Sequence, residues 1–220
     1  KPMEHAIDGK LSVPGDKSIS HRAVIFSSLA EGTSHISNFL SGEDCMRTIQ
    51  VFRELGVDID QSGSNLTIRS NGLESLKEAE RPVYFGNSGT TARLVTGLLA
   101  GLPLFTTCYG DPSLSKRPMD RVVGPLKEMG ANIDGRSKGR LLPLAIKGNN
   151  LQGITYEMPV KSAQVKSALL LAGMVAEGET TIIEQVKTRD HTEQMLPQFG
   201  GEISIQDKEI TIQGGQQLQP

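Results

Sequence analysis

The sequence predicts a mixed α/β (α+β) fold: an α-β prism of three pseudo-symmetric βαβαββ units, with buried helices and outer sheets. Three observations predict it. Similar patterns return about every seventy residues along the 220-residue chain. Each repeat contains an apolar helix that starts in a small, polar or basic segment. Each repeat also closes with two short alternating segments joined by polar residues, which is typical of a β-hairpin.

Each unit is expected to open with a short strand that leads into its first helix. The first helices begin near residues 18, 89 and 162 and end before small-residue segments at 30–32, 100–101 and 176–178. A glycine just past a helix is the expected stop, because glycine adopts a left-handed backbone without steric cost. The strands that follow these helices are predicted at 34–38, 104–108 and 180–184.

A second helix in each unit is expected to end at Gly56, Gly130 and Gly200, for the same reason. The closing hairpins are predicted at 57–60 with 66–69, at 131–134 with 142–146, and at 202–205 with 210–212. These antiparallel hairpins disfavour the alternative of a single open α/β sheet.

The first helices are more apolar than surface helices usually are. Ile19, Ala23, Phe26 and Ala30 form one stripe, and the faces beside it are apolar as well. The helix near 163–176 has the same character, whereas the second helices carry charges on one face. We therefore expect the first helices to pack into a common centre.

Composition excludes several classes of protein. The chain is 37% hydrophobic, carries a net charge of −2 and has only 4% aromatic residues, which argues against a nucleic-acid partner. Cys45 and Cys108 are too few for a disulfide scaffold and favour a reducing cytoplasm, with both thiols in the core. No apolar run is long enough to cross a bilayer, so no membrane partner is expected.

The four histidines are scattered without the spacing of metal ligands, so neither a metal nor a cofactor is expected. The last five residues, QQLQP, form a polar tail that is expected to lack structure of its own and to mark a cut.

The main functional signal lies at the helix starts. A helix start exposes unpaired N–H groups and the positive end of the helix dipole, so it favours anions. Residues 14–18 (PGDKS) precede the first helix, and Ser18 is the expected N-cap, with Arg22 one turn further on. Lys17 and Arg22 would be unfavourable there without an anion, which indicates a site for a phosphate or carboxylate. A nucleotide P-loop is rejected, because Asp16 stands where that motif needs glycine.

Three further segments place polar or basic residues at a helix start in the same way. Residues 86–93 (GNSGTTAR) combine two glycines, which allow close approach of a ligand, with Arg93 one turn into the helix. Residues 111–118 (DPSLSKRP) form a turn that places Arg117 near a helix start, with Pro118 expected at the first helical position. Residues 161–164 (KSAQ) open the third buried helix, and Arg189 precedes another helix. A substrate with several negative charges is the expected ligand.

Residues 13–22 (VPGDKSISHR), 86–93, 116–119 (KRPM) and 161–164 resemble, in order and spacing, the 5-enolpyruvylshikimate-3-phosphate (EPSP) synthase family. The resemblance covers essentially the whole chain. It implies two similar domains that close on their substrates, of which residues 1–220 would be the N-terminal, shikimate-3-phosphate-binding one, with the C-terminal domain as its missing partner. It also implies transfer of the enolpyruvyl group of phosphoenolpyruvate to the 5-hydroxyl of shikimate 3-phosphate, on the route to aromatic amino acids, by a cytoplasmic monomer.

The resemblance also implies roles for individual residues. Shikimate 3-phosphate contacts are expected at Lys17, Ser18, Arg22, Ser162, Ala163, Gln164 and Arg189, and phosphoenolpyruvate contacts at Lys17, Gly89, Arg117 and Gln164. Lys17 is also the catalytic candidate, for proton transfer near the reacting carbon. No carboxylate of this chain fits the general base.

Two departures from the family pattern matter. Ala163 replaces a serine found in many members, and Leu94 stands where many have proline. Gly89, rather than alanine, implies sensitivity of the complete enzyme to glyphosate, which occupies the phosphoenolpyruvate pocket in this family. The alternatives are a UDP-N-acetylglucosamine enolpyruvyl transferase, which would carry a reactive cysteine in the loop at 111–117, and a stand-alone anion-binding module.

Overall fold

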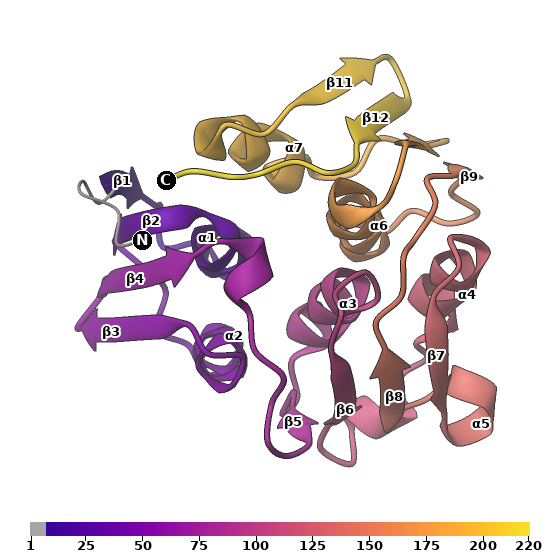
Figure 1. Ribbon diagram of the computed structural model, residues 1–220, viewed down its shortest axis with the longest axis horizontal. Coiled ribbons are helices and arrows are strands. Elements are labelled where there is room, and N and C mark those ends of the chain that lie inside the picture. The colour runs from indigo at the N-terminus through magenta and orange to yellow at the C-terminus, as the bar shows by residue number, and fades with distance from the viewer. Residues whose placement is uncertain (1–7) are drawn as a thin grey trace. The chain divides into compact units, whose positions relative to one another are not determined.

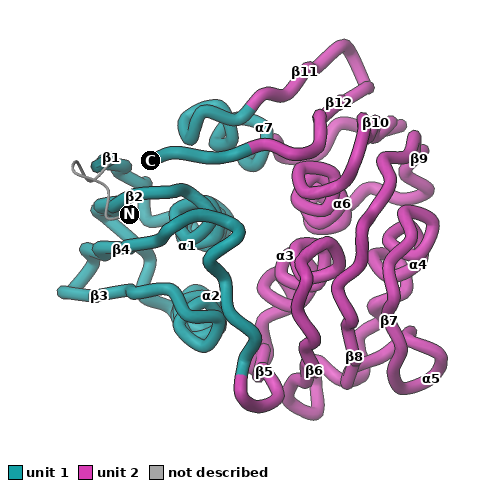
Figure 2. The backbone as a smooth tube through the Cα atoms, viewed as in Figure 1, with its two compact units in different colours: residues 1–79, 191–201, 217–220 teal, residues 80–190, 202–216 magenta. Residues whose placement is uncertain are grey.

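The computed structural model describes residues 8–220, which leaves His5 outside the described part of the chain. The chain divides into two compact units (Figure 2). Unit 1 contains residues 1–79, 191–201 and 217–220, and unit 2 contains residues 80–190 and 202–216. The chain thus enters unit 2 and returns to unit 1 twice.

The threefold repeat predicted from the sequence is confirmed by the sheet topology. Each of the three sheets has four strands in the same order, and each combines one parallel pair with two antiparallel pairs. The first sheet, in unit 1, has the order β1-β2-β4-β3 (Figure 1). Its strands are β1 (Asp8–Ser12), β2 (Glu31–Ser37), β3 (Asp58–Ser62) and β4 (Asn65–Asn71).

Unit 2 contains the other two sheets, with the orders β5-β6-β8-β7 and β9-β10-β12-β11. The strands of the second sheet are β5 (Val83–Tyr84), β6 (Phe105–Tyr109), β7 (Asn132–Gly135) and β8 (Leu144–Lys147). Those of the third are β9 (Thr155–Glu157), β10 (Glu179–Ile183), β11 (Ile203–Gln206) and β12 (Glu209–Gln213). All three predicted hairpins form, and each strand end differs from its predicted position by one or two residues.

The helices occupy the predicted places between strands. Unit 1 contains α1 (Lys17–Leu29), α2 (Glu43–Glu54), the short α7 (His191–Met195) and the 3-10 turns η1 (Leu73–Ser75) and η3 (Leu196–Phe199). Unit 2 contains α3 (Gly89–Leu99), η2 (Leu114–Lys116), α4 (Asp120–Glu128), the short α5 (Arg136–Gly139) and α6 (Ala163–Val175). The second helix of the third repeat is therefore split into α7 and η3.

The first helix of each repeat is buried on nearly all sides, as predicted. Ten consecutive residues of α1, residues 20–29, are buried, and so are residues 165–174 of α6. Within unit 2, α3 and α6 pack backbone to backbone: a Cβ built on Gly97 would lie 2.3 Å from the carbonyl oxygen of Ala168. Glycine is required at that contact, because any side chain would force the helices apart. A centre common to all three helices stays a prediction.

The expected glycine stops are right for the second helices and wrong for the first helices; α6, for example, ends at Val175 and continues into the extended Ala176, two residues before Gly178. Gly56, Gly130 and Gly200 have φ of 92°, 102° and 78° and follow their helices as predicted. In contrast, α1 ends without a glycine, since Ala30 turns directly into the extended conformation and β2 begins at Glu31. Gly32 lies inside that strand, and Gly101 has no positive φ.

The C-terminal residues contradict the expectation of an unstructured tail. Leu218 is buried, forms a parallel bridge with Ala30, and accepts a 2.9 Å hydrogen bond from the Glu31 N–H. The Gln219 N–H donates to the Phe199 carbonyl at 2.8 Å. The tail satisfies the backbone at the α1–β2 junction, which no local sequence pattern indicates.

Cys45 and Cys108 are both buried and unpaired, as predicted for core residues. Burial raises the pKa of the Cys45 thiol to about 11 and that of Cys108 to about 12. Across residues 8–220, no helix combines the length and apolar character that a membrane span requires.

Candidate functional site

The start of α1 differs in one respect from prediction. Asp16, rather than Ser18, is the N-cap: its carboxylate accepts a 2.9 Å hydrogen bond from the Ile19 N–H. An aspartate cap also compensates the helix dipole, which a serine does less well. Ser18 therefore lies in the first turn, with its hydroxyl free of the capping role.

Ser18 instead belongs to a hydrogen-bonded cluster with Arg22. The Arg22 guanidinium donates to Ser18 Oγ at 2.7 Å and to the Ser18 carbonyl at 3.1 Å, and its Nε donates to Thr192 Oγ1 at 2.8 Å. His191 Nδ1 lies 2.9 Å from Ser18 Oγ and shares a hydrogen bond with it. Arg22 is only 3% exposed, so these oxygens hold its charge rigidly in the interior of unit 1.

Lys17 lies at the edge of this cluster and points elsewhere. Its ammonium forms an ion pair with Asp44 of α2, and its side chain is 56% exposed. The next turn of α1 places His21 inside, where its Nδ1 lies 2.7 Å from Thr48 Oγ1. Burial, with a smaller contribution from Arg22, lowers the pKa of His21 to about 4. The histidine is therefore neutral beside a buried arginine.

The loop at 86–93 begins α3 as predicted. Ser88 is the N-cap, and its hydroxyl accepts a 3.1 Å hydrogen bond from the Thr91 N–H. Asn87 donates to both oxygens of Asp111 at 3.0 and 3.1 Å, and Asp111 also accepts from the Leu114 N–H at 2.7 Å. These bonds tie the loop at 86–89 to the turn that precedes Arg117.

The turn itself corrects one prediction. Pro118 does not occupy the first helical position, because α4 begins only at Asp120, after the 3-10 turn η2. Arg117 therefore sits in extended conformation between two helical segments, with φ −86° and ψ 132°. This conformation directs its exposed side chain back over the start of α3.

Two guanidinium groups meet over Gly89. A Cβ built on this residue would lie 2.7 and 2.8 Å from the two terminal nitrogens of Arg117 and 2.7 Å from Nη1 of Arg93. Burial, followed by the charges of Arg117 and Arg121, lowers the pKa of Arg93. Among the described residues, no carboxylate forms an ion pair with Arg93 or Arg117. Two neighbouring cations without a carboxylate make this surface strongly favourable for an anion.

Gln164 joins the same group from α6. Its side-chain oxygen accepts a hydrogen bond from Arg93 at 3.3 Å, and its nitrogen donates to Thr90 Oγ1 at 2.9 Å. Arg93 also donates to the carbonyls of Gly89 and Pro118, both at 3.2 Å. The starts of α3 and α6 are thereby linked, with Gly89, Arg117 and Gln164 brought together as the sequence indicated.

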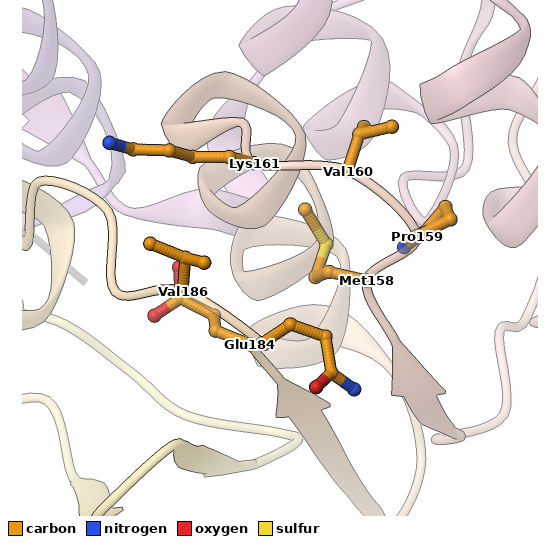
Figure 3. Close-up of a pocket in the computed structure, with 7 residues that line it drawn as sticks. Met158, Pro159, Val160, Lys161, Glu184 and Val186 are labelled. Atoms are coloured by element: carbon orange, nitrogen blue, oxygen red, sulfur yellow. The ribbon is translucent and has the colours of Figure 1, made fainter.

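The remaining predicted residues of unit 2 lie around the start of α6. Ser162 is the N-cap and accepts a 3.2 Å hydrogen bond from the Val165 N–H, and Ala163 is the first helical residue. Residues 158–161 and 184–186 line a hollow of about 150 Å³ beside this helix start. Figure 3 shows Lys161 extending away from Met158 and Pro159. Arg189 is exposed in the loop that follows β10.

The structure adds residues that the predicted site lacks. Arg93 stood in a predicted motif but not among the predicted contacts, although its i→i+4 spacing from Gly89 placed it on the same helix face. Asp111 and Thr90 order the surrounding loops through side-chain hydrogen bonds that spacing alone does not specify. No group of three His, Cys, Asp or Glu side chains within the described part of the chain could hold a metal ion.

Comparison with known proteins places this geometry in a family. The family model described as EPSP synthase (3-phosphoshikimate 1-carboxyvinyltransferase) matches residues 3–220. The chain is 56% identical over 219 residues to the 3-phosphoshikimate 1-carboxyvinyltransferase of Oceanobacillus iheyensis, and 52% identical to that of Bacillus pumilus. The alignment covers 100% of this chain and 51% of the Oceanobacillus protein. The structure of EPSP synthase from Acinetobacter baumannii superposes with a TM-score of 0.91 at 46% identity, over 97% of this chain and 48% of that one.

The fold and the sequence thus define a mixed α/β protein built from three repeated βαβαββ units. More narrowly, the chain belongs to the EPSP synthase family, as the resemblance of its motifs implied. It spans about half the length of the curated relatives it matches.

Proposed function

We propose that this chain is the N-terminal half of a 3-phosphoshikimate 1-carboxyvinyltransferase. The complete enzyme would transfer the carboxyvinyl group of phosphoenolpyruvate to the 5-hydroxyl of shikimate 3-phosphate and release phosphate. The observation that carries the proposal is the pairing of Arg93 and Arg117 over Gly89, with Gln164 bonded to Arg93. That arrangement can offset the charge of a compact, multiply charged acid, and it occurs in a chain of this family.

Phosphoenolpyruvate is assigned to the α3 start. Arg117 presents two terminal nitrogens above a residue without a side chain, so a phosphate or carboxylate can reach both nitrogens and the backbone of Gly89. Gln164 orients Arg93 and supplies an amide beside it. Lys17 is assigned to both substrates, and its exposed ion pair with Asp44 costs little to exchange for a substrate anion.

Shikimate 3-phosphate is assigned to the starts of α1 and α6. Ser18 and Arg22 are already held in one geometry, which reduces the entropy lost on binding. Ser162 offers a hydroxyl, Ala163 a backbone N–H and Gln164 an amide, and Arg189 completes the set from the loop after β10. The absent hydroxyl at Ala163 leaves only a backbone contact there.

The chemistry assigned to these residues has two stages. The 5-hydroxyl oxygen adds to the central carbon of phosphoenolpyruvate and gives up its proton, while the methylene carbon of phosphoenolpyruvate takes a proton and becomes a methyl group. Phosphate then leaves the tetrahedral intermediate as that methyl group loses a proton, which restores the carbon–carbon double bond. Lys17 is the candidate for proton transfer at the methylene carbon, while Arg22 and Arg117 offset the charge of two phosphates and two carboxylates. The general base is assigned to the other half of the enzyme.

Titration of the 220-residue chain tests the assignment. We expect the chain to keep its fold and to have negligible turnover, with weak, roughly millimolar binding of shikimate 3-phosphate, because half of the charge-assisted contacts are missing. In NMR titrations, signals of Ser18, Arg22 and Ser162 should shift first. Shifts confined to other residues, or turnover by the chain alone, would contradict the proposal.

Calorimetry with the second half supplied in trans sharpens the test. Adding the C-terminal half of the Oceanobacillus relative should tighten binding of shikimate 3-phosphate and restore some turnover. A stand-alone anion-binding module would gain nothing from that addition. A UDP-N-acetylglucosamine enolpyruvyl transferase is disfavoured because no cysteine stands in the turn at 111–117, and Cys45 in α2 and Cys108 in β6 are both buried.

The expected compartment is the cytoplasm, which suits two reduced thiols, and the complete enzyme is expected to be a monomer. Gel filtration of the full-length enzyme would test the second expectation.

A further inference from the structure

A buried ion pair in unit 2 has no part in the chemistry proposed above. The Lys166 ammonium lies 3.2 and 3.3 Å from the two carboxylate oxygens of Glu184, and the side chains are 1% and 5% exposed. A buried pair of this kind is a weak source of stability, since desolvation of both charges offsets most of their attraction. What the pair holds in place is therefore the more informative question.

Glu184 uses the same carboxylate to close a loop. Its Oε1 accepts the Thr188 hydroxyl at 2.5 Å and the Thr188 N–H at 3.3 Å. Its own N–H donates to the Lys208 carbonyl at 2.9 Å, which fixes the beginning of the loop beside the hairpin of β11 and β12. Residues 184–188 are thus tied at both ends through one residue. Gln185 and Val186 between them are exposed.

Lys166 connects that loop to the start of α6. It lies one helical turn after Ser162 and Ala163 and two residues after Gln164, so the helix that begins with proposed substrate contacts also anchors the loop. Residues 158–161, which lead into α6, line the same hollow as Glu184 and Val186, and Figure 3 shows Met158 on the side of Glu184 and Val186. The loop ends at Thr188, and the next residue is Arg189.

We propose that Lys166, Glu184 and Thr188 form a positioning relay that sets Arg189 at a fixed distance from the start of α6, and so determines affinity for shikimate 3-phosphate. The proposal rests on the proposed function of Ser162 and Arg189 as contacts of this substrate. None of the three relay residues is among the proposed substrate contacts. Their effect is to remove backbone freedom from an exposed arginine, which otherwise would have to be ordered at the moment of binding.

Thr188 offers the sharpest test because it is half-buried and uncharged. Thr188→Val keeps the shape of the side chain and removes the hydroxyl that donates to Glu184, whereas the matched control Thr188→Ser keeps the hydroxyl. In the full-length enzyme, we expect Thr188→Val to raise the KM for shikimate 3-phosphate about tenfold, with kcat and the KM for phosphoenolpyruvate changed less than about twofold. Thr188→Ser should match the unsubstituted enzyme.

A double-mutant cycle with Arg189 shows whether Thr188 acts through that arginine. Arg189→Ala alone should raise the same KM at least as much as Thr188→Val, and Thr188→Val should add nothing further once Arg189 is alanine. Additive effects of the two substitutions would overturn the relay. So would a Thr188→Val enzyme whose thermal unfolding midpoint falls while the KM for shikimate 3-phosphate stays constant.

The outcomes for the relay and for the proposed function are distinguishable. If Arg189→Ala raises the KM and Thr188→Val does not, the relay is wrong and the substrate assignment stands. If Arg189→Ala has no effect on that KM, the assignment of Arg189 is wrong, and the relay fails with it. If the full-length enzyme shows no turnover with these two substrates, the proposed function itself is wrong.

Discussion

The starts of α1 and α3 both carry arginines one turn inside a helix, yet the two arginines are held in different ways. Arg22, in unit 1, is buried and donates to Ser18 and Thr192, which are neutral oxygen acceptors. Arg93, in unit 2, bonds to neutral oxygens as well, but Arg117 lies beside it over Gly89. The start of α1 thus holds Arg22 in a network of neutral hydrogen-bond acceptors, whereas the start of α3 places two arginine side chains next to each other.

The difference indicates two ways of preparing a site for an anion. A buried arginine with satisfied bonds is preorganised, so its removal should affect folding as well as binding. Two adjacent arginines repel each other until an anion lies between them, so their removal should affect binding far more than folding. The following predictions test this comparison, from the largest expected effect to the smallest.

Acid should destabilise the folded state of unit 1, because His21 is buried there as a neutral side chain. Because burial lowers the pKa of His21 from 6.5 to about 4, the folded state disfavours the proton that the unfolded state takes up. Above pH 6.5, His21 is neutral in both states and the unfolding free energy keeps its full value. As the pH falls from 6.5 toward 4, only the unfolded state takes up the proton, so the unfolding free energy decreases by about 3 kcal/mol. Urea unfolding between pH 4 and pH 7 measures this loss.

The matched variants for this prediction lie in the same unit. His21→Gln should flatten the loss between pH 6.5 and pH 4, because glutamine does not titrate while still reaching Thr48. His35→Gln, at a partly exposed histidine paired with Asp8, should keep the loss seen without substitution. If His21→Gln retained the whole acid loss, the neutral state of His21 in the fold would be refuted.

Arg117→Ala should raise the KM for phosphoenolpyruvate about 100-fold in the full-length enzyme. Two charge-assisted hydrogen bonds of roughly 1.5 kcal/mol each would be lost, and the exposed position gives the fold little dependence on the side chain. The KM for shikimate 3-phosphate and the urea midpoint should hardly move. Equal increases in the KM values for both substrates would contradict the assignment of Arg117 to phosphoenolpyruvate.

Gly89→Ala should weaken binding of phosphoenolpyruvate while both arginine charges, at Arg93 and Arg117, are kept. The added methyl group would stand 2.7 Å from nitrogens of Arg93 and Arg117, so both flexible guanidinium ends must shift. We expect the two guanidinium groups to move by less than about 1 Å. This displacement should raise the KM for phosphoenolpyruvate about tenfold and should also weaken inhibition by glyphosate.

Gly124→Ala is the matched control for that substitution. A Cβ on Gly124, within α4, would meet nothing within 4 Å, so this variant should keep both KM values. If Gly124→Ala impaired phosphoenolpyruvate use as strongly as Gly89→Ala, the crowding over Gly89 would not be the cause.

Asp44→Asn should produce the smallest change. The Lys17–Asp44 pair is partly exposed, so its loss should cost less than about 1 kcal/mol of unfolding free energy, and the cost should shrink in about 0.5 M salt. Steady-state kinetics should show a KM for shikimate 3-phosphate within about threefold of the unsubstituted enzyme. A much larger rise would mean that Asp44 has a role in substrate binding beyond its pairing with Lys17.

Much of the fold was predictable because the repeat imposes the same local pattern three times. Alternating segments form the strands, and the apolar stripe of α1 signals a helix without a solvent face. The glycines at 56, 130 and 200 end helices because each has a positive φ. The same rule failed at Gly32, since the end of α1 depends on the distant Leu218 rather than on its neighbours.

The candidate site likewise has some residues that the sequence predicted and some contacts that only the structure shows. Lys17, Gly89 and Gln164 were predicted as substrate contacts because they stand in short motifs that resemble the EPSP synthase family, and these roles stay predictions. The capping role of Asp16 and the ion pair between Lys166 and Glu184 were not identified. Choosing between two adjacent caps, or pairing residues far apart in sequence, requires the geometry of the folded chain.

The sequence by itself determined the threefold repeat, the buried helices and the family, because these depend on periodicity and on short motifs within one segment. Only the tertiary structure decided that Arg117 turns back over Gly89 and that Glu184 holds Thr188. Those contacts join segments whose side-chain directions are set by packing and by the loss of water around charges. No spacing rule along the chain encodes either effect.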